Sequence, residues 1–243
     1  MQKKDHISIP KGNTQRGVYQ SVFTYLFKNN IAAKSILDVP AGEGEFLETY
    51  LQFFPDSKIT GIDPFAIPKQ TIATAIEKST AHLSQAIQKK ESYDLVTCLS
   101  GVMCFDGIDS LVEKFHICLK PNGILIISND NVLTIRDRLS FLFFGNVKRF
   151  KLFFKPDEGN WNLILPQGLW KLCRSHHFCV EDVVYCSITA DDLLWVVLLP
   201  VFLPFYYLSL LTQGKHLSFS EKRKLFPIKS LIARHYYLVC RKS

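Results

Sequence analysis

The sequence predicts an α/β fold in which a mostly parallel sheet carries helices on both faces, within one domain of residues 1–243. Three observations support this. Short apolar runs alternate with stretches of helical periodicity through the first half of the chain. The 243 residues suffice for one domain with a sizeable core and an insertion or two. The chain is 47% hydrophobic and 21% charged, which is typical of a folded protein.

The elements of the first half follow in order. The expected helices share apolar residues at helical spacing: residues 13–29, 45–54, 68–78 and 108–119. The expected strands share short apolar runs bounded by turn residues: residues 35–39, 58–63, 80–83, 93–99 and 124–128. An alternation of this kind implies parallel strands with both faces covered.

The second half adds a helix at residues 166–176 and two strands, residues 178–186 and 235–241. With these, the expected sheet has seven strands. Two segments interrupt the alternation, and we interpret them as insertions: residues 129–161 are apolar and basic, and residues 187–234 are hydrophobic.

A glycine-rich turn follows the first strand. Gly42 and Gly44 let the backbone approach a bound ligand closely, and Asp63 ends the second strand, where a carboxylate can accept both hydroxyls of a ribose. The turn and the acid are separated by 19 to 21 positions, close to the expected value of about 20.

Four motifs, in order and spacing, resemble those of class I S-adenosylmethionine-dependent methyltransferases: ILDVPAGEGEF, ITGID, YDLVTC and LKPNGIL. The resemblance covers residues 35–128 and implies a Rossmann-like sheet whose last strand, residues 235–241, runs antiparallel to residues 178–186. It also implies S-adenosylmethionine as the cofactor. By this resemblance the methionine end would be wrapped by Asp38, Ala41, Gly42 and Gly44, while Asp63 would hold the ribose and Leu99 would lie near the adenosine.

The sequence departs from the family at two places. Pro40 stands where the family usually has its first glycine, and a proline can occupy such a turn at negative φ. Residues 82–85 supply no acid to face the adenine. The alternatives are a dinucleotide-binding domain, whose turn would read G-x-G-x-x-G rather than P-A-G-E-G, and a relative that has lost activity.

The cysteines and the N-terminal residues indicate the cellular compartment of the protein. None of the seven cysteines forms a C-x-x-C pair or stands at zinc-ligand spacing with histidine, so we expect no metal. We interpret them as reduced thiols in a cytoplasmic protein. The first residues are polar and lack the apolar core of a secretion signal.

The first insertion interleaves charge with large apolar side chains. Residues 129–155 hold six basic and two acidic side chains among many leucines and phenylalanines. Such interleaving is typical of an element at a membrane interface, where each basic residue contributes about 1 kcal/mol near anionic lipid. The alternative is an amphipathic lid that packs on the domain itself.

The second insertion contains residues 193–211, which carry no charge and approach the length of about 20 that spans a bilayer. Pro200 and Pro204 are expected to break the helix twice. The strand that follows must join the same sheet, so the segment is expected to dip into the membrane and return, or to lie flat on it. A buried pair of core helices is the alternative.

The carboxyl ends of parallel strands meet at one edge of a sheet, so both insertions should surround the mouth of the site. At this edge we select Asp106 and Asp130 as candidates for a base or an acceptor contact. The alternative is that these two aspartates cap helices or turns and take no part in the reaction.

We therefore expect an enzyme that O-methylates a small-molecule, glycan or lipid-linked acceptor at the inner, cytosolic face of a membrane. The stretch after the fifth strand looks like that of bacterial methyltransferases acting on surface glycans or their lipid carriers. Motifs of nucleic-acid methyltransferases are missing, so the charge of +7 fits an anionic membrane better than nucleic acid. An RNA or protein methyltransferase, and a non-catalytic membrane-associated protein with this fold, remain alternatives.

Overall fold

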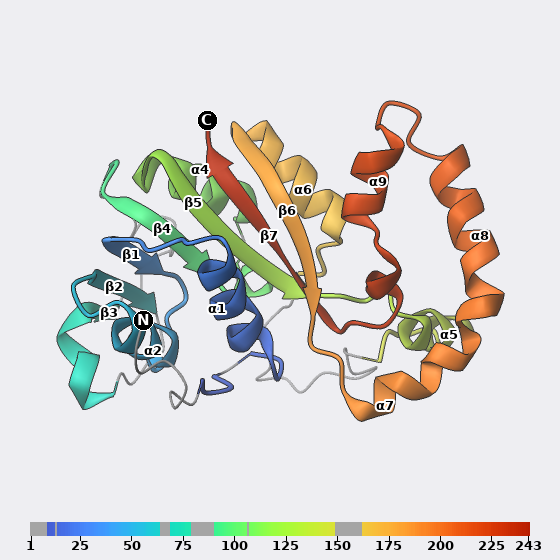
Figure 1. Cartoon of the computed structure of the whole chain (residues 1–243), viewed down its shortest axis with the longest axis horizontal. Coiled ribbons are helices and arrows are strands. Elements are labelled where there is room, and N and C mark those ends of the chain that lie inside the picture. The colour runs from blue at the N-terminus through green and yellow to red at the C-terminus, as the bar shows by residue number, and fades with distance from the viewer. Residues whose placement is uncertain (1–8, 13, 64–68, 79–89, 106, 149–161) are drawn as a thin grey trace.

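The computed structural model describes residues 9–12, 14–63, 69–78, 90–105, 107–148 and 162–243 (Figure 1). Within them the sheet has the order β3-β2-β1-β4-β5-β7-β6. Its strands are β1 Ser35–Asp38, β2 Lys58–Asp63, β3 Ile76–Lys78, β4 Tyr93–Cys98, β5 Leu119–Asp130, β6 Phe178–Cys186 and β7 His235–Lys242. Neighbouring strands are parallel except that β7 runs antiparallel to both β5 and β6. The expected fold class is confirmed, with β3 reduced to a three-residue edge strand.

The longer helices are α1 Val18–Lys28, α2 Glu45–Phe53, α4 Ile108–Cys118, α5 Ile135–Phe144, α6 Pro166–Ser175 and α8 Leu199–Thr212. Shorter helical segments are η1 Gln70–Ala75, η2 Val102–Cys104, α7 Ala190–Leu193, η3 Leu194–Leu198, α9 Phe219–Leu225 and η4 Ile228–Leu231. Figure 1 shows α1 and α4 on opposite sides of the sheet, and α8 at the far end of the molecule, beyond α9.

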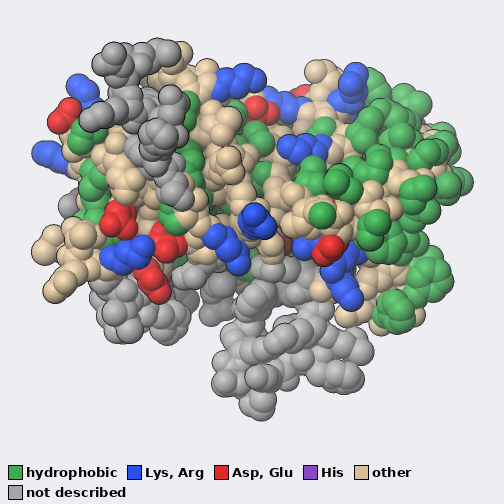
Figure 2. Space-filling view, turned by 60° about the horizontal axis from the view of Figure 1, so that its bottom comes forward, with side chains coloured by type: hydrophobic (Ala, Val, Ile, Leu, Met, Phe, Trp, Pro, Cys, Tyr) green, Lys and Arg blue, Asp and Glu red, His purple; other side chains and the backbone are tan. Residues whose placement is uncertain are grey.

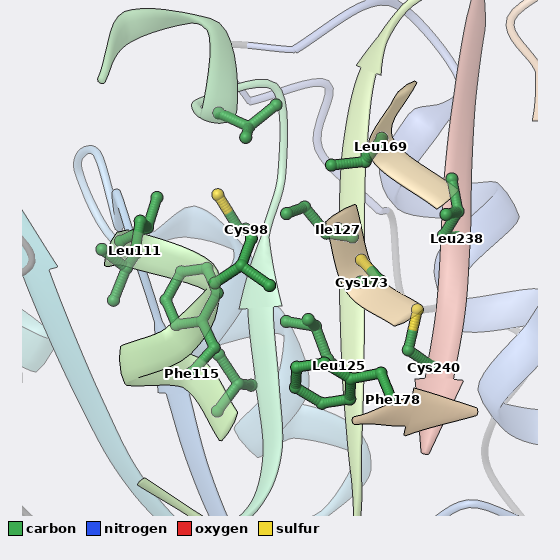
Figure 3. Packing of buried hydrophobic residues seen from close by; sticks show 14 of the residues in the cluster. Cys98, Leu111, Phe115, Leu125, Ile127, Leu169, Cys173, Phe178, Leu238 and Cys240 are labelled. Atoms are coloured by element: carbon green, nitrogen blue, oxygen red, sulfur yellow. The ribbon is translucent and has the colours of Figure 1, made fainter. Parts of the chain in front are cut away.

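Both faces of the sheet are buried. On β5, Leu125 and Ile127 enter the core layer of α4 and α6, whereas Ile124 and Ile126 enter the layer of α1 and α2. Figure 3 shows side chains of the first layer, among them Phe115 of α4, Cys98 of β4, and Leu125 and Ile127 of β5. Successive side chains of a strand point to opposite faces, so a continuous apolar run is what a sheet covered on both sides requires.

Five of the described cysteines belong to this interior and form no disulfide: Cys98, Cys118, Cys173, Cys186 and Cys240. Cys179 is exposed and also free. Among the described residues, no group of three or more His, Cys, Asp or Glu side chains is arranged to hold a metal ion.

The helix predicted over residues 68–78 is confirmed only as a short 3-10 helix, and the prediction is wrong from Ile76 onward. Residues 70–75 form the 3-10 helix η1, and Ile76 begins β3, where it pairs with Gly61 of β2. A β-branched residue gains more from this edge pairing and from packing on the glycine turn than from another helical turn. The strand expected at residues 80–83 lies outside the described residues.

The second insertion differs from its prediction at Pro204. Helix α8 continues through this proline instead of breaking there, and Pro200 stands in its first turn. A first-turn N–H has no partner within the helix, so Pro200 removes no hydrogen bond, while Pro204 removes one. Together with α7 and η3, α8 forms a helical stretch, Ala190–Thr212, that is long and apolar enough to cross a membrane by length and composition.

Candidate cofactor and acceptor site

The carboxyl ends of β1, β2, β4, β5 and β6 meet at one edge of the sheet, and the antiparallel β7 begins there. Ligands of open α/β sheets bind at this edge. Every candidate residue that the structure describes stands on it, or on the turn that follows β1.

The glycine turn and the acid at the end of β2 come together. The N–H of Gly42 donates to Oδ2 of Asp63 at 2.8 Å, and the N–H of Ala41 donates to the carbonyl of Ile62 at 3.1 Å. Gly42 and Gly44 have φ of 55° and 87°, the left-handed region that favours glycine. The turn is thereby fixed against the end of β2, and Gly44 packs directly against the side chains of Ile72 and Ile76.

Asp38 ends β1 beneath this turn and is almost fully buried. Its Oδ1 accepts a hydrogen bond of 2.6 Å from the hydroxyl of Thr97 on β4. Burial raises the pKa of the Asp38 carboxyl from 3.8 to about 7; the Thr97 hydrogen bond opposes this rise and the charge of Asp63 adds to it. A buried carboxyl of this kind is stabilised by a cation, such as an ammonium group, that enters the site.

Leu99 follows β4 and is buried in the same core cluster as Ala41. Tyr19 of α1 packs edge-on against Phe46, with ring centroids 5.3 Å apart. Burial and the nearby charges of Asp38 and Glu45 raise the pKa of the Tyr19 phenol. Tyr19 thus places the start of α1 close to Asp38 and to the first turn of α2.

The residues present fit the cofactor that the sequence resemblance implies. Two acidic side chains, Asp38 and Asp63, flank the glycine turn. A carboxylate suits ribose hydroxyls, and an ammonium group beside Asp38 would stabilise its ionised form and so offset the cost of its burial. The structure thus brings together Asp38, Ala41, Gly42, Gly44, Asp63 and Leu99, and their individual contacts to the cofactor stay predictions.

Asp130, a candidate base, lies at the end of β5 and is 2% exposed. Its Oδ1 lies 3.1 Å from Nδ1 of His235, which stands opposite it in the β5–β7 ladder. Nε2 of His235 lies 3.0 Å from the hydroxyl of Ser128 and 3.3 Å from that of Ser100, a partly exposed residue after β4. Asp130 thus reaches the edge of the sheet through His235 rather than directly. The other candidate, Asp106, lies outside the described residues.

His235 and Ser100 were not among the site residues predicted from the sequence. His235 looked like the first residue of a terminal strand, and no local pattern marks it. Its role becomes visible only when β7 is paired with β5 in register, which sets His235 opposite Asp130. A pairing between positions 105 residues apart leaves no periodic signal in one sequence.

Both insertions flank this edge. With the exception of Leu163, all large apolar side chains that are exposed in the described part of the chain belong to them. Figure 2 shows hydrophobic side chains gathered at the end of the molecule that carries α8, with Lys and Arg side chains beside them. We call this the apolar surface; it is formed by exposed residues of α5, α7, η3 and α8, including Phe141, Phe144, Leu194, Val197 and Phe205.

Comparison with known proteins bears on the site. The sequence profile of a family described as a methyltransferase domain matches residues 13–193. No curated protein matches the sequence.

Three solved structures show the same fold. A SAM-dependent methyltransferase from Archaeoglobus fulgidus is 16% identical, with 93% of this chain and 96% of that chain covered and a TM-score of 0.54. A possible histamine N-methyltransferase from Thermotoga maritima is 15% identical, with coverages of 94% and 91% and a TM-score of 0.56. The 1,6-didemethyltoxoflavin-N1-methyltransferase of Burkholderia thailandensis, solved with S-adenosylhomocysteine, is 13% identical, with coverages of 93% and 78% and a TM-score of 0.51.

Proposed function

The chain belongs to the methyltransferase-domain family and is an S-adenosylmethionine-dependent methyltransferase, and from this premise we propose that it O-methylates a small-molecule, glycan or lipid-linked acceptor at the cytosolic face of a membrane. The cofactor supplies an electrophilic methyl group on a sulfonium. The protein has to place the acceptor and, for a hydroxyl, accept its proton.

The apolar surface carries this proposal. Phe141, Leu142, Phe143 and Phe144 of α5 are 63% to 73% exposed, and Val197 and Phe205 exceed 70%. A soluble monomer rarely exposes a contiguous apolar patch of this kind, which is typical of a surface that contacts lipid or a partner. The net charge of +7 favours anionic lipid.

Helix α8 gives a second argument. It is apolar on all sides, yet Leu210 is its only buried residue. A helix that is hydrophobic all round is stable when lipid or protein covers it on all sides, and here the domain covers one side only. The alternative of a buried core helix pair is therefore disfavoured.

Chain connectivity favours a helix that lies along the membrane over one that crosses it. Strands β6 and β7 precede and follow the insertion and pair with each other, so both ends stay on one side. The hydroxyl of Tyr206 on α8 donates to the carbonyl of Phe226 at 2.6 Å, and Nζ of Lys222 donates to the carbonyl of Leu210 at 2.8 Å. These bonds hold α8 against the domain, as expected for a peripheral or monotopic protein.

The network of Ser100, His235 and Asp130 supports a hydroxyl acceptor. A histidine that contacts a carboxylate through Nδ1 can receive a proton through Nε2, here by way of the Ser100 hydroxyl. The network stands at the ends of β4 and β5, the edge at which the methyl group is transferred.

Co-sedimentation with vesicles tests the membrane proposal. We expect the wild-type protein to sediment with phosphatidylcholine–phosphatidylglycerol vesicles, and the double variant Phe143→Ser/Phe144→Ser to lose most of this binding, since each side chain contributes roughly 1.5–3 kcal/mol when buried. The control is Leu51→Ser, a single substitution at a half-buried leucine of α2, at the other end of the molecule (Figure 1), and its thermal unfolding is compared with that of the wild type.

Three outcomes would count against the proposal or against the assignment on which it rests. A wild-type protein that stays wholly in the supernatant and binds no lipid would end it. Tighter, salt-dependent binding to RNA would favour an RNA methyltransferase instead. Failure to bind S-adenosylmethionine by calorimetry would contradict the enzymatic assignment itself.

A further inference from the structure

A polar cavity of about 210 Å³ lies where β5 ends, β7 begins and α5 starts. Three cationic side chains line it: Arg136 from α5, Lys148 from the segment after α5, and Arg234 directly before β7. Two carboxylates, Asp137 and Asp192, line it as well.

The carboxylates are engaged within the fold. Asp137 accepts from the Thr134 hydroxyl and from the backbone N–H of Lys148. Asp192 accepts from the N–H and the hydroxyl of Thr189 at 2.8 and 2.9 Å, and from Nε of Arg234 at 2.8 Å. These bonds hold the walls of the cavity in place. Nη1 of Arg136 also lies 3.9 Å from Oδ1 of Asp192, and the three cationic side chains exceed the two carboxylates by one positive charge.

Arg234 retains an unused donor. Its Nη2 is buried and makes no hydrogen bond to any residue that the structure describes. The nearest carboxylate oxygen recorded for this nitrogen belongs to Asp191, at 4.0 Å, too far for a hydrogen bond. A buried guanidinium nitrogen without an acceptor costs free energy unless a ligand oxygen supplies one.

An apolar cavity of about 660 Å³ adjoins the polar one, and Asp137 lines both. Leu139, Phe141 and Leu142 of α5 and Phe202 of α8 line it together with apolar residues before and after α5, and Arg138 lines it as well, so it opens beside the apolar surface. A polar and an apolar cavity that share a wall match a ligand with an anionic head and an apolar chain.

We propose that the polar cavity binds the phosphate group of a lipid acceptor, with the lipid chain in the adjoining apolar cavity. Guanidinium groups bind phosphate oxygens through paired, charge-assisted hydrogen bonds. The site adjoins the Ser100–His235–Asp130 network, because Asn131 follows Asp130 and Arg234 precedes His235. The N–H of Asn131 donates to the carbonyl of Arg234 at 2.8 Å. This assignment rests on the proposed membrane function and narrows its acceptor to a lipid that carries a phosphate monoester.

Calorimetric titration of the full-length protein with three probes tests the assignment. The probes are dihexanoyl phosphatidic acid, dihexanoyl phosphatidylcholine and inorganic phosphate. We expect phosphatidic acid to bind at least about tenfold more tightly than either of the others, because it alone has both a phosphate monoester and a chain.

Substitutions test the contacts to the phosphate separately from the contacts to the lipid chain. Arg136→Gln and, separately, Lys148→Gln should each weaken phosphatidic acid binding about tenfold or more. Arg223→Gln, which removes the same charge from the exposed face of α9, should change it less than about twofold. Leu142→Gln should weaken the binding of phosphatidic acid but not that of inorganic phosphate. Thermal unfolding of each variant checks that the fold persists.

The outcomes distinguish this assignment from the membrane proposal. Unchanged phosphatidic acid binding in both Arg136→Gln and Lys148→Gln would overturn the cavity assignment, even if the protein binds phosphatidylcholine–phosphatidylglycerol vesicles. Equal affinity for inorganic phosphate and phosphatidic acid would overturn the claim that the bound phosphate belongs to a lipid. Loss of phosphatidic acid binding in Arg136→Gln would uphold the cavity, even if the wild type ignored vesicles and the membrane proposal failed.

Discussion

The buried carboxyl of Asp38 makes the stability of the cofactor-free protein depend on pH. Burial raises the pKa of this group from 3.8 to about 7. At 1.36 kcal/mol for each pH unit, this difference corresponds to on the order of 4 kcal/mol in the free energy of unfolding. That is a large share of the roughly 5–15 kcal/mol by which a domain is usually stable.

The sign follows from which state holds the proton. The folded state binds the Asp38 proton more tightly than the unfolded chain does, so protonation stabilises the fold. This contribution is fully present below pH 3.8 and is lost as the pH rises through about 7. Asp38→Asn mimics the neutral acid and can still accept the hydrogen bond of Thr97. The unfolding free energy of this variant should therefore not fall as the pH rises through about 7.

Urea unfolding of the cofactor-free protein between pH 4 and pH 8 measures the effect. The difference in unfolding free energy between Asp38→Asn and the wild type should grow with pH toward the stated 4 kcal/mol, and its steepest change should lie below about pH 7. Asp56→Asn, at an exposed aspartate, serves as the control and should leave the profile unchanged. A difference that is flat with pH would refute the reasoning that burial dominates at Asp38.

Three further predictions concern the site. Asp63→Ala should abolish S-adenosylmethionine binding in calorimetry while circular dichroism shows the fold intact; undiminished binding would contradict the ribose assignment. Gly44→Ala should lower the unfolding free energy by at least about 1 kcal/mol more than Gly17→Ala. Both glycines have φ of 87°, but a Cβ at Gly44 would stand 1.9 Å from Cδ1 of Ile72, whereas one at Gly17 would meet nothing within 4 Å; equal costs would contradict the packing argument. Ser100→Ala should lower kcat by about 100-fold with cofactor affinity unchanged, and an unaltered kcat would remove the proton-transfer role.

Much of the fold was predictable because its signals are local. The bounds of β2 and β6 agree with the apolar runs that predicted them, and most other elements agree within one or two residues. Where the local signal was ambiguous, as at residues 70–78, pairing with β2 decided between helix and strand. The tertiary environment overrides weak propensity in this way wherever a short apolar run has an open strand edge beside it.

The meeting of the glycine turn with Asp63 was also predictable, because the turn and the acid follow consecutive strands of known order. The acceptor side was not. Asp130 could be selected from its place after β5, but its partner His235 comes from the antiparallel strand at the other end of the chain. The cavity of Arg136, Lys148 and Arg234 likewise combines residues of both insertions, which α6 and β6 separate in the chain.

The sequence by itself determined the order of strands and helices, the turn and acids of the cofactor site, and the two insertions with their unusual composition. Each of these is written in neighbouring residues, through periodicity and spacing. Only the tertiary structure decided that α8 lies exposed along the domain, that Asp130 contacts His235, and that a basic cavity adjoins an apolar one. Register between distant strands and the burial of a helix depend on what packs against them, and a single sequence does not encode this in any local pattern.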